Sequence, residues 1–166
     1  MREHFDKIVV AFDFSETSEA AWAVACRLAV ALNSQVHLLH VSPDPLRQAW
    51  TVEAASVDFS AVAEEWRQQA AARLAAVTPL AGLEEGRITR VVTAGVAHTV
   101  VTEYASAEHA DLIVVGTHGY GPVKHLLLGS VAERIVRQAS CPVLTVPHRM
   151  VREQALQQRE AAATMP

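Results

Sequence analysis

The sequence predicts an α/β fold, in which helices cover both faces of an open, doubly wound parallel sheet of five strands. Short Val- and Ile-rich runs alternate with segments of helical periodicity along the chain, an order typical of parallel sheets. The clearest run, 112–115, contains no polar residue, as expected for a strand buried on both faces. Of the 166 residues, 51% are hydrophobic and only 5% are aromatic, which suits helices packed on an aliphatic sheet.

Each predicted element has its own boundary signals. Strands are expected over 7–13, 35–41, 88–93, 111–115 and 142–146. A segment rich in capping residues, 14–18, precedes the first helix, which has apolar residues at helical spacing and which Asn33 is expected to end. Further helices are expected over 59–77, which ends before Pro79, over 97–108 and over 130–138.

Length and charge narrow the class of protein. We expect one domain over 1–147 and a polar tail over 148–166 to which no function is assigned. The net charge is −4 and no stripe of Lys and Arg is present, so a nucleic-acid partner is not expected. The first seven residues are too charged for a signal peptide, and no apolar stretch reaches the length of a membrane span. The sequence therefore favours a cytoplasmic protein without a membrane partner.

The two cysteines, Cys26 and Cys141, stand far apart in the sequence and in no CxxC pair. A zinc site, a redox motif and a disulfide framework are therefore not expected. Both residues are expected to be inert packing residues, as free cysteines usually are.

Two segments that directly follow strands are the candidates for a functional site. In an open parallel sheet, ligands bind outside the carboxyl ends of the strands, where the strand order reverses. Ala11, Phe12 and Asp13 end the first predicted strand, and a Gly-rich segment over 116–121 follows the fourth. There the pattern is G-x-x-G, nine residues, then G-S, formed by Gly116, Gly119, Gly129 and Ser130.

This glycine pattern is suited to phosphate binding. Glycines let backbone N–H groups approach phosphate oxygens and permit a positive φ. Gly129 and Ser130 open a predicted helix, whose first N–H groups and dipole favour an anion.

Structural explanations for the same residues remain open. Asp13 and Glu16 have capping-box spacing, so Asp13 is also a candidate N-cap; Ser130 and Glu133 form a complete capping box, for which we expect a structural role. The glycines are also candidates for simple turn residues. His118 has no metal-ligand or nucleophile partner at a recognisable spacing, so backbone support or a ribose contact is favoured over catalysis. Lys124 is taken as a solvated charge.

The chain resembles the universal stress protein family over about residues 7–147. The G-x-x-G-9x-G-[S/T] pattern is that family's nucleotide-binding signature. Other matches, in the same order, are VAFDFS at 10–15, LLHV at 38–41, ADLIVVG at 110–116, GSVAER at 129–134 and CPVL at 141–144. Pro122 lies inside the nine-residue stretch, and the segment from 42 to 60, which contains Trp50, does not align with the family.

The resemblance implies a Rossmann-like sheet in the order 3-2-1-4-5 and a site for ATP or another adenine nucleotide, with Mg²⁺ as an optional companion. Asp13 would lie at the ribose and adenosine end. The main chain around Ala11 and Val41 would meet the adenine, with Phe12 between Ala11 and Asp13. The ribose and phosphate path would be lined by Gly116, His118 and Gly119, and the phosphates held by Gly129, Ser130 and Val131.

The sequence leaves three classes of function open. The favoured one is a nucleotide-dependent sensor whose surface is read by an unidentified protein partner. The second is a slow ATPase or a nucleotide α-hydrolase relative, but the G-x-x-x-x-G-K-[ST] loop is missing, which argues against efficient hydrolysis. The third is a ligand-free interaction module. Under all three the resemblance implies a homodimer through the apolar edge strand at 142–146.

Overall fold

A computed structural model describes residues 4–44, 59–117 and 128–147 of the chain. In it, five parallel strands form one sheet in the order β3-β2-β1-β4-β5, which confirms the predicted fold class and strand order. The strands are β1 (Lys7–Ala11), β2 (Gln35–Ser42), β3 (Ile88–Ala94), β4 (Leu112–Gly116) and β5 (Val143–Val146). Each lies within two residues of its predicted boundaries.

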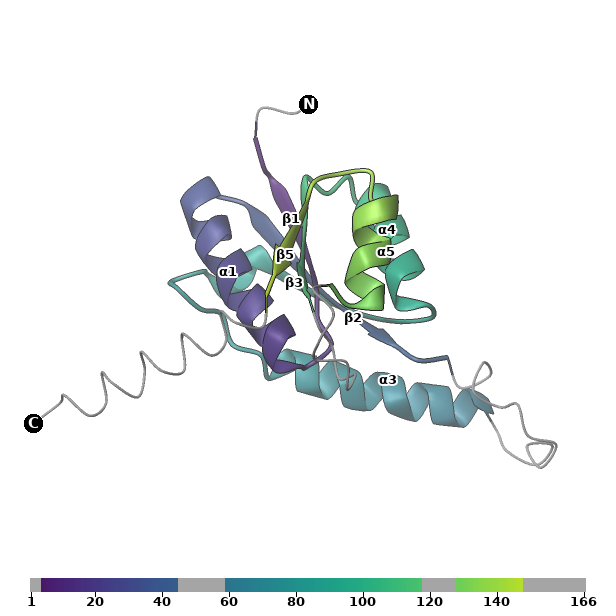
Figure 1. The fold of residues 1–166 in the computed structure, drawn as a ribbon. Helices are drawn as coiled ribbons and strands as arrows, with labels where there is room; N and C mark the ends of the chain where they lie inside the picture. Colours follow the sequence, from purple (N-terminus) through teal and green to yellow (C-terminus); the bar gives the residue numbers. More distant parts are fainter. Residues whose placement is uncertain (1–3, 45–58, 118–127, 148–166) are drawn as a thin grey trace, which may run out of the picture.

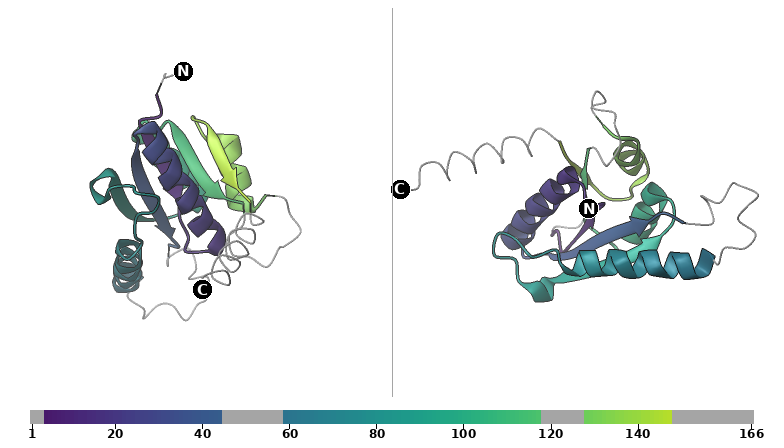
Figure 2. Two further views of the ribbon diagram at one scale, coloured as in Figure 1. Left: turned by 90° about the vertical axis from the view of Figure 1, so that its left-hand side faces the viewer. Right: turned by 90° about the horizontal axis from the view of Figure 1, so that it is seen from below.

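Within the described residues, four α-helices surround this sheet: α1 (Glu16–Leu32), α3 (Phe59–Ala75), α4 (Ala97–Ala107) and α5 (Ser130–Gln138). In Figure 1, α1 lies on one side of the strands and α4 and α5 lie on the other. Figure 2 (left) shows α1 in front of the sheet, with α3 beside it at the β2–β3 side. Helices on both faces, as predicted, leave the central strands buried.

The period of two along each strand divides the core into two layers. On β1, Ile8 and Val10 point into the layer under α1 and α3, and Val9 points into the layer under α4 and α5. All three side chains are fully buried. Burial of one aliphatic side chain contributes about 1.5–3 kcal/mol to folding stability. The packed central strands therefore fix the position of the carboxyl edge of the sheet.

Helix ends are fixed by specific groups. Ser15 is the N-cap of α1, and Asn33 ends the helix in the left-handed conformation (φ 58°), with its N–H donating to the Ala29 carbonyl; this confirms the predicted stop. Arg87, just before β3, donates to the Ala29 and Ser34 carbonyls. Arg90 donates to the Leu74 and Val77 carbonyls at the end of α3. Arg87 and Arg90 thus tie the C-terminal ends of α1 and α3 to the beginning of β3.

The cysteines lie apart and free, Cys26 fully buried and Cys141 partly buried. Burial raises the pKa of both thiols, as expected for packing residues rather than reactive ones. In the part of the chain that the structure describes, no helix is long and apolar enough to cross a bilayer.

Candidate functional site

The strand order brings the two predicted site segments together at the carboxyl edge of the sheet. Ala11, the last residue of β1, lies opposite Val115 of β4 on one side and Leu39 of β2 on the other. The Phe12 N–H continues the ladder to the Leu39 carbonyl at 2.9 Å. Because α1, which follows β1, and α5, which follows β4, lie on opposite faces of the sheet, Asp13 and Gly116 flank the point where strand order reverses, here called the switch point, as predicted.

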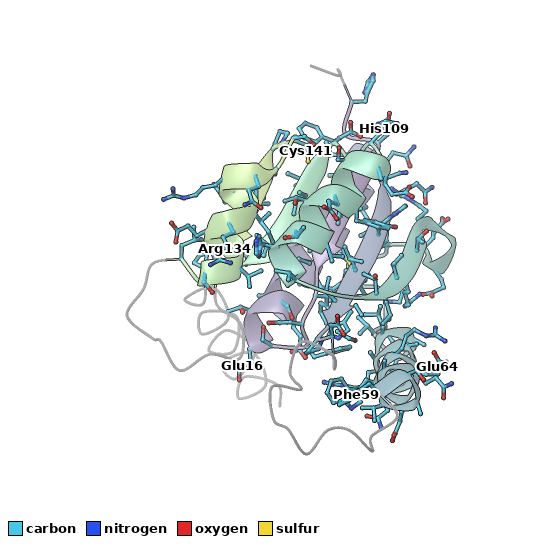
Figure 3. All side chains as sticks on the ribbon, turned by 90° about the vertical axis from the view of Figure 1, so that its right-hand side faces the viewer. Glu16, Phe59, Glu64, His109, Arg134 and Cys141 are labelled. Carbon is cyan, nitrogen blue, oxygen red and sulfur yellow. The ribbon has the colours of Figure 1, made fainter. Side chains whose placement is uncertain are left out.

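Val41, the predicted adenine neighbour, lies near the end of β2, level with Thr93 of β3 and partly buried. It is therefore on the same edge as Ala11, one strand away. In Figure 1 the strands run downward from the N-terminus, so this edge is at the bottom, where α1 begins. In Figure 3, Glu16 marks this edge, whereas His109 and Cys141 lie at the opposite one.

The start of α5 is fixed to the end of β4. The Gly129 N–H donates to the carbonyl of Thr117, and the Thr117 N–H donates to the Val146 carbonyl at 2.9 Å. Ser130 and Val131 follow in the first turn, and both are exposed. The helix start that the sequence assigned to phosphates therefore lies at the same edge as Gly116.

The predicted capping box at Ser130 and Glu133 is wrong. Gly129, which has no side chain with which to cap the helix, is the N-cap of α5, in extended conformation (φ −69°, ψ 155°). Ser130 is already the first helical residue, which places Glu133 one position too late to reach back. Glu133 instead pairs with Arg137 at 2.9 Å. The Ser130 side chain is therefore not the N-cap of α5.

Asp13 is not the N-cap of α1 either. Ser15 holds that position, and its side chain accepts the Ser18 N–H. Asp13 instead accepts hydrogen bonds from the Ser15 N–H, at 3.0 Å, and the Ser15 hydroxyl. The sequence signal failed because Asp and Ser are both good caps and only the position of the first helical turn decides between them. The exposed Asp13 carboxylate therefore lies just outside the helix, at the switch point.

Gly116 is required for a close approach, not for a positive φ. A Cβ there would lie 2.9 Å from the Thr17 carbonyl carbon, the Thr17 carbonyl oxygen and the Thr17 Cβ. The first turn of α1 therefore packs directly against the end of β4. Gly129 has a negative φ, so neither glycine is needed there to supply a positive φ.

The remaining predicted contacts, His118 and Gly119, lie outside the described residues, as do Pro122, Lys124 and Trp50. Within the described ranges, no three His, Cys, Asp or Glu side chains are grouped so that they could hold a metal ion.

Beside Asp13 lies a cluster that sequence reasoning missed, which we call the Phe14 stack: Phe12, Phe14, His40 and Arg73. The centroid of the Phe14 ring lies 5.2 Å from that of Phe12 and 4.7 Å from that of His40. The Arg73 guanidinium carbon lies 3.8 Å from the Phe14 centroid. His40 Nδ1 lies 2.8 Å from the Phe12 carbonyl and, facing an acceptor, donates to it.

Burial is the main cause of a lowered His40 pKa; the bond to Phe12 and the Asp13 charge oppose that shift, and the Arg73 charge adds to it. The neutral ring therefore dominates near pH 7. Period-two alternation on β2 could have placed His40 on the face under α1 and α3, but nothing in the sequence pairs it with residues on α3.

Comparison with known proteins agrees with this architecture. The model of the universal stress protein family matches residues 4–147. A universal stress protein of Methanocaldococcus jannaschii is 32% identical over 148 residues, which cover 86% of this chain and 82% of the relative.

Several solved structures resemble the chain, and two of them illustrate the likeness. That of a hypothetical protein, described as a structure-based assignment of biochemical function, has a TM-score of 0.71 and 25% identity, over 87% of this chain and 96% of the other. A universal stress protein in complex with cAMP has a TM-score of 0.57 and 26% identity, over 87% and 98% of the two chains.

The parallel sheet in the order 3-2-1-4-5, the switch point between β1 and β4, and the match over 4–147 lead to one conclusion. The chain belongs to the universal stress protein family.

Proposed function

We propose that this protein binds an adenine nucleotide, in the first place ATP, at the carboxyl edge of its sheet and acts as a stress-response sensor. The observation that carries the proposal is the meeting of Asp13, Gly116 and the start of α5 across the switch point. A universal stress protein crystallised with cAMP shares the fold and 26% of its residues with this chain, which supports an adenine nucleotide as the ligand class.

Phosphate binding is assigned to the start of α5. The Glu133 N–H donates to the Gly129 carbonyl, which is the first intrahelical bond. The N–H groups of Ser130, Val131 and Ala132 precede it and have no intrahelical acceptor. Together with the helix dipole, they favour an anion.

The nucleoside is assigned to the ends of β1 and β2. The Asp13 carboxylate would accept from ribose hydroxyls, and the main chain at Ala11 and Val41 would meet the adenine. We place Gly116, His118 and Gly119 along the path between ribose and phosphates. Mg²⁺ would enter only with the nucleotide phosphates.

The proposed sensor comprises residues 1–147 and works in the cytoplasm, where ATP is abundant. A partner protein would read the surface that changes with the bound nucleotide. Slow hydrolysis is compatible with the site, but the G-x-x-x-x-G-K-[ST] loop, whose lysine assists phosphoryl transfer, is missing from the sequence. Nucleotide binding rather than hydrolysis is therefore proposed as the main activity.

A homodimer through β5 is part of the proposal. Within the described residues β5 pairs with β4 alone, and Leu144 on it is 36% exposed. An apolar edge strand of this kind is usually paired or covered. Leu144→Lys should shift the protein to a monomer in sedimentation measurements, and an unchanged dimer would refute pairing through this edge.

The function is tested by the ligand itself. Protein purified without added nucleotide is denatured, and released small molecules are identified by mass spectrometry; ATP is then titrated into stripped protein by calorimetry. Gly119→Val should weaken binding at least about tenfold, or about 1.4 kcal/mol. Gly86→Val is the matched control, because a Cβ at Gly86, near the opposite edge of the sheet, meets nothing within 4 Å. A stripped protein that ignores ATP would contradict the proposal and favour the ligand-free interaction module.

A further inference from the structure

Phe14 adopts a backbone conformation that a bulky residue rarely takes. Its φ is 62°, in the left-handed region, which costs an L-residue other than glycine free energy and calls for an explanation. The residue lies between Asp13, the proposed nucleoside contact, and Ser15, the N-cap of α1. Strain at such a place points to a functional constraint when surrounding contacts enforce it.

Side chains from three elements enforce this conformation. The ring of Phe14 contacts Phe12 at the end of β1 and His40 on β2, and Arg73 of α3 lies over it at 3.8 Å. His40 also holds the Phe12 carbonyl at 2.8 Å. The same cluster thus fixes the Phe12 backbone, which precedes Asp13, and the Phe14 ring, which follows it.

The left-handed turn at residue 14 has a direct consequence for Asp13. It folds the chain so that the Asp13 carboxylate reaches across Phe14 to the Ser15 N–H at 3.0 Å and to the Ser15 hydroxyl. The orientation of this carboxylate therefore depends on the conformation of Phe14, although the Phe14 ring points into the stack and not toward Asp13's partners.

We propose that Phe14, clamped by Arg73 and His40, is a positioning residue that orients the Asp13 carboxylate for the nucleoside and so sets the affinity for adenine nucleotides. This inference rests on the proposed function and extends it to residues that do not belong to the glycine pattern. Because Asp13 serves the nucleoside end, loosening the stack lowers the affinity for adenosine, AMP and ATP by the same factor. A substitution that damages the phosphate site at the start of α5 should instead cause a loss of affinity that increases with the number of phosphates on the nucleotide.

The first test is independent of any ligand. Amide hydrogen exchange of the Ser15 N–H, followed by NMR, should become at least about fivefold faster in Phe14→Leu and about threefold faster in Arg73→Gln, since each weakens the contacts that hold the turn. Exchange at Ile113, in the centre of the sheet, reports global stability and should change far less. Arg67→Gln is the matched control, because Arg67 lies on the same helix as Arg73 but, among the described residues, forms its ion pair with the exposed Glu64, away from the Phe14 stack. Unchanged Ser15 exchange in Phe14→Leu overturns the positioning role, whether or not the protein binds nucleotide.

The second test is a double-mutant cycle on nucleotide affinity measured by calorimetry. Phe14→Leu should weaken adenosine, AMP and ATP alike by about tenfold in the otherwise wild-type protein, and by less than about twofold when Asp13 is already alanine. An equal loss in both backgrounds would show that the stack acts without Asp13 and would refute the proposal. A wild-type protein that binds no adenine nucleotide would refute the proposed function and, with it, the effect on affinity, while the exchange result still decides whether Phe14 orients Asp13.

Discussion

The contact between Gly116 and Thr17 makes a quantitative prediction about how tightly α1 packs on the sheet. In Gly116→Ala the new Cβ would lie 2.9 Å from three atoms of Thr17, two of them in the backbone. Real Cβ atoms do not approach that closely, and backbone at the start of a helix cannot swing away as a side-chain tip can. The first turn of α1 must therefore shift, or the end of β4 must.

The size of the effect follows from two opposing contributions. Overpacking a well-packed site costs about 1–3 kcal/mol. Replacing glycine by alanine restricts the unfolded chain and returns about 0.4–1 kcal/mol. We expect a net loss of about 1–2 kcal/mol in the free energy of unfolding, which for a chain of this size lowers the Tm by about 2–8 °C.

Urea unfolding followed by circular dichroism measures this loss. Gly86→Ala is the control, since its Cβ would meet no atom within 4 Å and its φ is not in the left-handed region; we expect it to stay within about 0.5 kcal/mol of wild type. If Gly116→Ala proved as stable as Gly86→Ala, the close approach of α1 to β4 would be refuted, and with it the explanation of Gly116 as a packing requirement.

Three further predictions concern stability and are measured by urea unfolding. Arg87→Ala should cost about 1–3 kcal/mol because the Ser34 carbonyl, just after α1, loses both of its Arg87 donors. Arg67→Ala, which loses only an exposed ion pair, should change stability by less than about 0.5 kcal/mol; equal effects would contradict this. Ser15→Ala should cost about 1 kcal/mol as the loss of an N-cap, whereas Ser130→Ala should be nearly neutral, and a loss at Ser130 as large as that at Ser15 would restore the capping box. Burial lowers the pKa of both His37 and His40 in the folded state, so the folded chain binds fewer protons and the free energy of unfolding should fall as the pH drops below about 6.5. His40→Asn, which keeps a donor, should reduce that fall, and an identical pH profile would refute the contribution of His40.

The sequence was sufficient to predict the order of the strands once the family resemblance was considered, and helix boundaries to within two residues. The reason is that hydrophobic periodicity and capping residues are local signals. Asn33 ends α1 as expected, because a left-handed C-cap depends on that residue and its immediate neighbours. Similarly, the uninterrupted aliphatic run of β4 left little choice but a buried strand.

The site was predictable in outline but not in its internal contacts. Local spacing suggested Asp13 as a cap and Ser130 as the start of a capping box, and both predictions are wrong because the first helical residue lies one or two positions away from where spacing placed it. The Phe14 stack joins residues 12, 14, 40 and 73, and the packing of Thr17 on Gly116 joins residues 99 positions apart. Tertiary contacts of this kind leave no mark in the periodicity of one sequence.

The central claim is that the carboxyl edge of the sheet binds an adenine nucleotide, and the most direct test is an NMR titration of stripped protein with ATP. We predict saturable chemical-shift changes at the amides of Asp13, Gly129, Ser130 and Val131, with His109 and Cys141, at the opposite edge of the sheet, unchanged (Figure 3). Changes centred on the opposite edge, or no changes at millimolar ATP, would contradict the claim.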